Sequence, residues 1–268
     1  YKDVRCSGEQ NGEITLSAKN FDPKKGFQYL IAGDPAGWQT VKPVPAATSG
    51  SITLKNLASK IYNISIRYDD TAGSCSFPVA QEIKSPKKLK VDAWVEQVLK
   101  CSTGAIIKAK ASDGTPGYRY ELRETDGVTV VKAFQDSDTF LDIKITGNYK
   151  VVAKDLNDCE TEVLASVDIV PPVRPKLENV TPSVCFDKNA GTNITIKVTD
   201  GVPDYTYTVK YNGGNPVGPS ATFAGPTFTY KAENEGTYEF IVTDSFGCSS
   251  DPITQVITAQ LLAATPVT

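Results

Sequence analysis

Apolar and polar residues alternate with period two in three stretches of the chain that lie about ninety residues apart. Because successive side chains of a β-strand point to opposite faces, each stretch predicts a strand with one buried face. No stretch shows a sustained 3.6-residue apolar stripe, and the nearest candidate, residues 91–99, suits a strand equally well. The chain is therefore predicted to be all-β. The apolar positions of the three stretches are Ile14, Leu16 and Ala18; Ile107, Ala109 and Ala111; and Ile194, Ile196 and Val198.

The same two elements follow each alternating stretch. The first is a turn, rich in glycine and twice in proline, that leads into an aromatic strand, at residues 26–29, 114–120 and 201–207. The second is a closing strand that begins at a tyrosine, and we expect this tyrosine to bury its ring and bond its hydroxyl to the backbone, as in immunoglobulin-like sandwiches. The three tyrosines are Tyr62, Tyr149 and Tyr238. This order predicts three tandem immunoglobulin-like β-sandwich domains in an elongated arrangement.

The length and the proline clusters set the expected boundaries. A chain of 268 residues fits two or three domains, and the repetition favours three. Prolines cannot sit in a central strand, so residues 85–88 and 170–175 are expected to be connectors. We define the first, second and third repeats as residues 1–86, 87–172 and 173–262, and we interpret residues 263–268 as a linker or tail.

The six cysteines follow the repeats, with one near the start of each and one after each closing tyrosine strand. This registration predicts the pairs Cys6–Cys75, Cys101–Cys159 and Cys185–Cys248. A bridge closing about 60 residues is worth about 4 kcal/mol in the chain-entropy model. The alternatives are buried free thiols in a reducing compartment and, less favoured, a zinc site, since no His and no Cys-x-x-Cys occur. Bridged cysteines imply an oxidising location outside the cytosol.

Charge and composition narrow the classes of function. The 28 basic and 31 acidic residues leave a net charge of -3, without a patch suited to nucleic acid, and no apolar run is long enough for membrane insertion of this segment. The absence of histidine removes the usual general base, so we expect no enzyme; glycoside chemistry on paired carboxylates is a distant alternative. A chain that begins at Tyr1 and lacks Met is expected to be a piece of a longer polypeptide.

The motifs around the cysteines resemble the SprB-type repeats of giant surface adhesins in gliding Bacteroidetes. The resemblance covers nearly the whole chain and rests on short motifs at residues 6–8 and 11–14, 201–205, 236–238 and 244–248, with 147–149 and 155–159 repeating the closing element. The first repeat departs from the pattern, because it lacks the proline turn and has a longer closing segment. The resemblance implies export by the type IX route, display on the cell surface with outer-membrane attachment through regions outside this segment, and a role in adhesion or gliding.

Two functions of different classes follow. The leading hypothesis is a non-catalytic structural stalk of a secreted cell-surface adhesin, whose partners are neighbouring repeats of the same polypeptide. The alternative is a carbohydrate- or protein-binding module, in which Trp38 is the candidate ligand contact for a surface polysaccharide or another cell-surface ligand. We interpret Trp94 as a core or interface residue.

Two smaller features concern modification and metal. Thr71, in Asp70-Thr71-Ala72, fits a bacterial O-glycosylation signal, whereas the N-linked sequons at Asn63, Asn179 and Asn193 are discounted. Acidic residues recur before each closing cysteine, so calcium is a weaker alternative to a chain without cofactors, since aspartates are also common turn formers. These residues are Asp69, Asp70, Asp155, Asp158 and Asp244.

Overall fold

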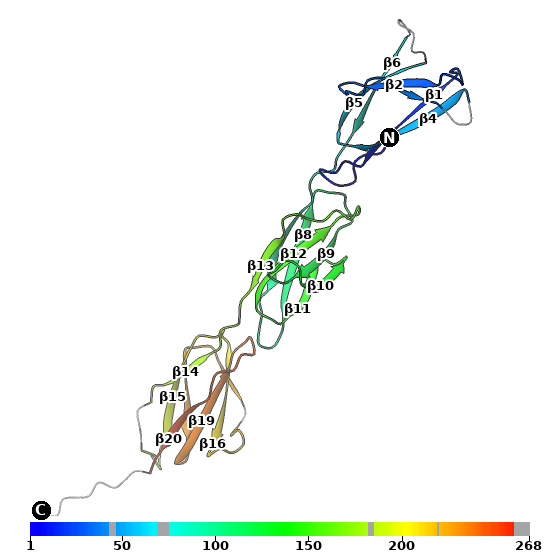
Figure 1. The fold of residues 1–268 in the computed structure, drawn as a ribbon. Coiled ribbons are helices and arrows are strands. Elements are labelled where there is room, and N and C mark those ends of the chain that lie inside the picture. The colour runs from blue at the N-terminus through cyan, green and yellow to red at the C-terminus, as the bar shows by residue number, and fades with distance from the viewer. Residues whose placement is uncertain (43–46, 69–74, 182–184, 219, 260–268) are drawn as a thin grey trace, which may run out of the picture. The chain divides into compact units, whose positions relative to one another are not determined.

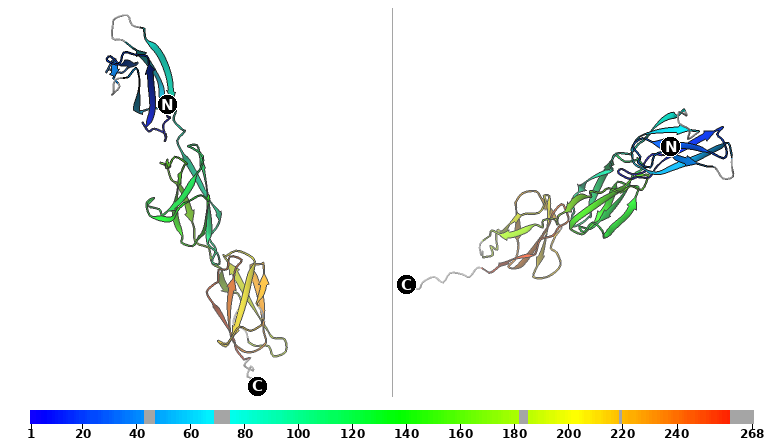
Figure 2. Two further views of the ribbon diagram at one scale, coloured as in Figure 1. Left: turned by 90° about the vertical axis from the view of Figure 1, so that its right-hand side faces the viewer. Right: turned by 45° about the horizontal axis from the view of Figure 1, so that its top comes forward.

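The computed structural model describes residues 1–42, 47–68, 75–181, 185–218 and 220–259. Within these ranges the regular structure consists of β-strands alone, as the ribbon of Figure 1 and the further views of Figure 2 show. No helix of the described residues is long and apolar enough to cross a membrane. The all-β prediction is confirmed.

Within the described ranges the strands form six sheets, two in each of the three repeats. Strand pairs such as β1–β4, β9–β12 and β16–β19 are antiparallel. In the first repeat, β1 pairs with β4, and a second sheet has the order β3-β2-β5-β6. These strands are β1 (Gly12–Lys19), β2 (Phe27–Ile31), β3 (Gln39–Val41), β4 (Ser49–Leu57), β5 (Lys60–Arg67) and β6 (Phe77–Ile83).

The second repeat contains sheets of the orders β11-β8-β7 and β10-β9-β12-β13. Its strands are β7 (Lys90–Gln97), β8 (Ala105–Ser112), β9 (Arg119–Arg123), β10 (Val130–Gln135), β11 (Thr139–Ile143), β12 (Gly147–Lys154) and β13 (Ala165–Ile169). The stretch with ambiguous periodicity is thus a strand, β7.

The third repeat contains sheets of the orders β14-β15-β18 and β17-β16-β19-β20. Its strands are β14 (Lys176–Asn179), β15 (Thr192–Thr199), β16 (Tyr205–Tyr211), β17 (Ala221–Phe223), β18 (Thr227–Ala232), β19 (Gly236–Thr243) and β20 (Ile253–Ile257). The sheet order of the first repeat, with β5 between β2 and β6, recurs here as β19 between β16 and β20. The fold is a tandem series of β-sandwiches.

The cores follow the alternation of the sequence. All nine apolar positions predicted to face inward are buried. In the third repeat they pack with Phe228, Phe240 and Ile257, and burying a phenylalanine of this kind is worth about 2 to 3 kcal/mol. The rings of the three closing tyrosines are buried, and the Tyr62 and Tyr238 hydroxyls donate to the carbonyls of Ala58 (3.1 Å) and Asn234 (2.8 Å). The tyrosine prediction is confirmed for ring burial in all three and for the hydroxyl bond in these two.

The chain divides into two compact units. The first comprises Tyr1–Ala93, Ala109–Asp138 and Tyr149–Ser166, and the second comprises Trp94–Lys108, Thr139–Asn148 and Val167–Thr268. Several strands of the second repeat contribute residues to both units. The predicted boundaries after residues 86 and 172 stay predictions, and each unit is described by itself below.

Candidate functional site: two disulfide clasps

A buried aspartate organises the loop that follows the closing strand in the second and third repeats. Asp155 Oδ1 accepts hydrogen bonds from the backbone N–H groups of Asn157 and Cys159, both 2.9 Å long. Its Oδ2 accepts a third, 2.9 Å long, from the N–H of Thr115. Asp244 repeats this arrangement: Oδ1 accepts from the N–H groups of Phe246 (2.9 Å) and Cys248 (2.8 Å), and Oδ2 accepts from the N–H of Val202 (3.0 Å). Each aspartate therefore fixes the backbone of the cysteine four residues later.

A glycine turn lies directly against each of these aspartates. Gly114 and Gly201 have φ angles of +61° and +69°, a region that favours glycine. A Cβ added at Gly114 would lie 2.9 Å from Asp155 Oδ2, and one at Gly201 would lie 3.1 Å from Asp244 Oδ2. The turn before the aromatic strand thus needs glycine both for its backbone and for its close approach to the carboxylate.

The cysteines in these two loops are bonded to the first cysteine of the preceding repeat. Cys6 is bonded to Cys159, with 5.6 Å between their α-carbons, and Cys101 is bonded to Cys248, with 5.0 Å. We call the first bridge and its contacts the N-terminal clasp, which lies in the first unit, and the second the C-terminal clasp, which lies in the second unit. Cys75 and Cys185 are free and exposed.

The predicted pairing within each repeat is therefore wrong: Cys6 does not pair with Cys75, Cys101 does not pair with Cys159, and Cys185 does not pair with Cys248. In the first and third repeats, the two cysteines lie at opposite ends of the repeat's last strand.

The strands β6 and β20 separate these cysteines. The segment before Cys6 lies beside the end of β6, where the Val4 N–H donates to the Lys84 carbonyl (3.0 Å), whereas Cys75 precedes the start of β6. A seven-residue strand spans roughly 23 Å, and a disulfide requires α-carbons about 5 to 6 Å apart. The third repeat has the same geometry, because the Phe186 N–H donates to the Thr258 carbonyl (2.8 Å) after β20 while Cys248 precedes this strand.

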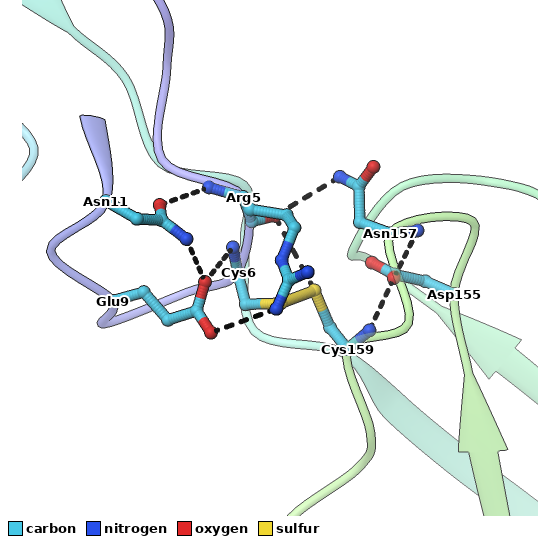
Figure 3. Close-up of polar contacts among 7 residues, drawn as sticks. All are labelled: Arg5, Cys6, Glu9, Asn11, Asp155, Asn157 and Cys159. Carbon is cyan, nitrogen blue, oxygen red and sulfur yellow. Dashed lines mark hydrogen bonds and ion pairs between the residues drawn. A yellow bond between two sulfur atoms is a disulfide. The ribbon is translucent and has the colours of Figure 1, made fainter. Parts of the chain in front are cut away.

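Charged and amide side chains surround the N-terminal clasp, as Figure 3 shows. Glu9 Oε2 accepts from the Cys6 N–H (3.1 Å) and from Asn11 Nδ2 (2.6 Å), and the other carboxylate oxygen lies 3.7 Å from the Arg5 guanidinium. From the opposite loop, Asn157 Nδ2 donates to the Arg5 carbonyl (3.2 Å). Hydrogen bonds thus accompany the covalent link on both sides.

The C-terminal clasp uses an aromatic side chain and backbone groups instead. The Ser102 N–H and hydroxyl both donate to the Phe246 carbonyl, at 3.1 Å each. The Lys100 ammonium lies 4.9 Å from the centre of the Phe246 ring, within cation–π range. Gly247, with φ +75°, packs so closely that an added Cβ would lie 2.8 Å from Ser102 Cβ. The two loops are therefore in direct contact beside the bridge.

Among the described residues, the other candidates do not gather into a second site. Trp38 is partly buried, and the Arg67 guanidinium lies 4.0 Å from the centre of one of its rings. Trp94 is 41% exposed and its indole N–H donates to Glu96 (2.8 Å), so the core interpretation of Trp94 is wrong. Thr71, with Asp69 and Asp70, lies outside the described residues.

The carboxylates that suggested calcium have other partners. Asp155 and Asp244 use their oxygens for backbone N–H groups, as described above, and Asp158 Oδ1 accepts from the Arg119 guanidinium (2.6 Å). Within the described ranges, no three His, Cys, Asp or Glu side chains are grouped as metal ligands would be. The recurrence of aspartate before the closing cysteine is explained by the geometry of the loop.

In comparisons with known proteins, the sequence matches no family model and no curated protein. Solved structures of several kinds are similar to the chain. The three Ig domains of mouse nectin-like molecule 4 are 11% identical and cover 97% of this chain and 98% of their own, with a TM-score of 0.33. The BSP domain of a biofilm-associated protein is 12% identical and covers 97% of this chain and 66% of its own, with a TM-score of 0.33.

The fibronectin(III)-like modules of Clostridium thermocellum CbhA are 18% identical and cover 67% of this chain and 98% of their own, with a TM-score of 0.29. At these TM-scores the likenesses add nothing to the fold, which rests on the strands and sheets described above.

Proposed function

We propose that this chain is a non-catalytic structural segment of a secreted cell-surface adhesin, built to carry tension through consecutive β-sandwich repeats. The observation that supports this proposal is the interleaving of its two disulfides along the sequence. Cys101 lies inside the loop closed by Cys6 and Cys159, and Cys159 lies inside the loop closed by Cys101 and Cys248. Residues 101–159 of the second repeat therefore belong to both covalent loops.

Interleaved bridges limit how far the chain extends under force. Cys6 and Cys248 are 242 positions apart, but the shortest covalent path through both bridges includes only the 58 positions from Cys101 to Cys159. At roughly 3.4 Å per extended residue, this stretch reaches about 200 Å when oxidised and about 800 Å when reduced. A segment that anchors a cell to a surface gains from this limit, because unfolding of a repeat releases little length.

The disulfides also support the proposed location. Structural disulfides persist in oxidising environments outside the cytosol. Together with the resemblance to SprB-type repeats, they support export by the type IX route, attachment to the outer membrane through regions outside this segment, and a role in adhesion or gliding. No cofactor is part of the proposal.

Single-molecule pulling between the two ends of the chain tests the proposal. For the oxidised chain we expect about a quarter of the reduced extension between Cys6 and Cys248. Removing one bridge with Cys101→Ser and Cys248→Ser leaves the 89 positions from Cys159 to Cys248 as the shortest path, which reaches about 300 Å. Equal extensions in oxidised and reduced protein would contradict the proposal, as would hydrolysis of a glycan or peptide by the purified chain.

A second candidate function is binding of a surface polysaccharide or another cell-surface ligand at Trp38. The partial exposure of the indole favours it, although the stacked Arg67 guanidinium covers one ring face. In a glycan-array experiment, Trp38→Ala would abolish binding, whereas Trp94→Ala, which removes an exposed indole from β7, would not. Equal binding by both variants and the parent would exclude Trp38 as the contact.

A further inference from the structure

The two free cysteines lie in the same segments of their repeats as the bonded ones. Cys185 lies beside the end of its repeat's last strand, where it forms a parallel bridge with Thr258. Cys6 follows two residues after Val4, whose N–H donates to the Lys84 carbonyl just beyond the end of β6. Cys75 lies between β5 and β6, as Cys159 lies between β12 and β13 and Cys248 between β19 and β20. Each free cysteine is thus the counterpart of one half of a clasp.

The two bridges also follow one rule of sequence. In both, the first cysteine of a repeat is bonded to the closing cysteine of the next repeat, with separations of 153 and 147 positions. By this rule, Cys185 requires a closing cysteine about 150 positions after it, and Cys75 requires a first cysteine about 150 positions before it. Neither position lies within the 268 residues of this chain.

We propose that Cys185 and Cys75 form disulfides with further repeats of this same type, so that each pair of consecutive repeats shares one bridge. We call each of these two unbonded cysteines a half-clasp. The partner of Cys185 is the closing cysteine of a following repeat, and the partner of Cys75 is the first cysteine of a preceding repeat. The exposure of both thiols leaves them accessible to such partners. The inference uses the pairing on which the proposed function rests and adds the chemical identity of the neighbours.

The covalent step is an oxidation by thiol–disulfide exchange. The two thiols lose their protons and two electrons as the S–S bond forms, and a disulfide oxidant is reduced to two thiols. In the test this oxidant is oxidised glutathione, which becomes two molecules of reduced glutathione.

A direct head-to-tail fusion of two copies of the chain provides the test. In the fusion, 83 residues follow Cys185 of the first copy and Cys75 is the 75th residue of the second, so the two are 158 positions apart, close to the two observed separations. The fusion with Cys75→Ser in the first copy and Cys185→Ser in the second retains only this pair of half-clasps. The reverse fusion carries Cys185→Ser in the first copy and Cys75→Ser in the second. It retains Cys75 of the first copy and Cys185 of the second, a pair that the rule does not join.

Both fusions are oxidised in a glutathione buffer, alkylated and analysed by intact mass and non-reducing peptide mapping. We expect at least about tenfold more bridged product from the first fusion than from the reverse one, because the clasp geometry raises the effective concentration of the two thiols. Equal alkylation of both fusions, or equal bridging in both, would overturn the proposal.

A mixture of unfused chains gives a second measurement that does not depend on the linker. One chain carries Cys75→Ser and the other Cys185→Ser, mixed in equal amounts. Random pairing gives as much heterodimer as the two homodimers together, and we expect the Cys185–Cys75 heterodimer to exceed that sum. A heterodimer yield at or below the sum of the homodimers would overturn the half-clasp assignment. If pulling shows the redox-dependent extension while both bridging tests fail, the proposed function stands and the identity of the neighbours is wrong.

Discussion

In the N-terminal clasp both bonded cysteines are partly exposed and their neighbours are charged or amide side chains, whereas in the C-terminal clasp Cys248 is fully buried and its loop presents Phe246 to Lys100 and Ser102. The loops of the two closing cysteines are nevertheless alike, with three backbone N–H groups on one buried aspartate and a glycine turn against it. The aspartate, its three backbone hydrogen bonds and the glycine turn recur in both loops. The side chains that contact the segment of the first cysteine differ between them.

Removal of either bridge is expected to have the largest effect on stability. Each closes a loop of roughly 150 residues, which is worth about 5 kcal/mol in the chain-entropy model. The pair Cys101→Ala and Cys248→Ala should cost about 1 kcal/mol more than Cys6→Ala and Cys159→Ala, because Cys248 is 0% exposed and its loss leaves a cavity. Denaturant titration of both double variants measures this difference, and an equal loss in the two would show that burial of Cys248 contributes nothing.

Replacement of the loop aspartates tests the part that the clasps share. Asp155→Asn and Asp244→Asn each replace one accepting oxygen by an amide, so the N–H of Thr115 or Val202 loses its acceptor, and we expect each change to cost about 2 kcal/mol. The control is Asp158→Asn, which removes only an exposed ion pair with Arg119 and should cost about 0.5 kcal/mol or less. Calorimetry on the three variants decides the matter. If Asp155→Asn and Asp244→Asn differ by more than the control's effect, the two loops are not equivalent.

The strands could be predicted from the sequence because the alternation of apolar and polar residues is a local property. The inward positions, the turns before the aromatic strands and the closing tyrosines all depend on residues within about ten positions of one another. The recurring aspartate before the closing cysteine was also visible, although its role as an acceptor for the N–H groups of Cys159 and Thr115 depends on a turn forty residues away.

The disulfide pairing could not be obtained from the repeat pattern alone. Registration shows that Cys6 and Cys75 belong to the same repeat, but it does not show that β6 separates them along its length. The bonded partner lies in the next repeat, and neither hydrophobic periodicity nor turn residues carry information about a contact between repeats. The signal that the sequence does contain is the similar spacing of Cys6–Cys159 and Cys101–Cys248, which becomes informative once one of these bridges is known.

The non-covalent contacts of the two clasps should respond differently to salt. Glu9→Gln weakens the bonds from the Cys6 N–H and Asn11, and we expect a loss of about 0.5 kcal/mol that shrinks at high ionic strength. Lys100→Gln removes the cation–π contact with Phe246 and should cost a similar amount. Thermal unfolding at low and high salt compares the two variants. If the stability loss of Lys100→Gln depended on salt more strongly than that of Glu9→Gln, the proposed difference between a polar N-terminal clasp and an aromatic C-terminal clasp would be wrong.

The smallest expected effect concerns the loop beside the free Cys185, which is the unbonded counterpart of the first-cysteine segments in the two clasps. Hydrogen bonds from the backbone N–H groups of Ala190 and Asn189 lower the pKa of Asp187 below its ordinary value. Because the folded-state pKa is depressed, the carboxylate stabilises the loop above its unfolded pKa of about 3.9, and this contribution is lost as the pH falls through the lower folded pKa.

Asp187→Asn cannot lose a charge in acid, so its melting temperature should fall less than that of the parent between pH 5 and about pH 2.5. Carbon-13 NMR of the Asp187 carboxyl gives the midpoint directly. A midpoint at or above the ordinary value would show that the loop around Cys185 is not held in the described conformation, and the likeness between the free half-clasp and the bonded ones would then rest on the strand ends alone.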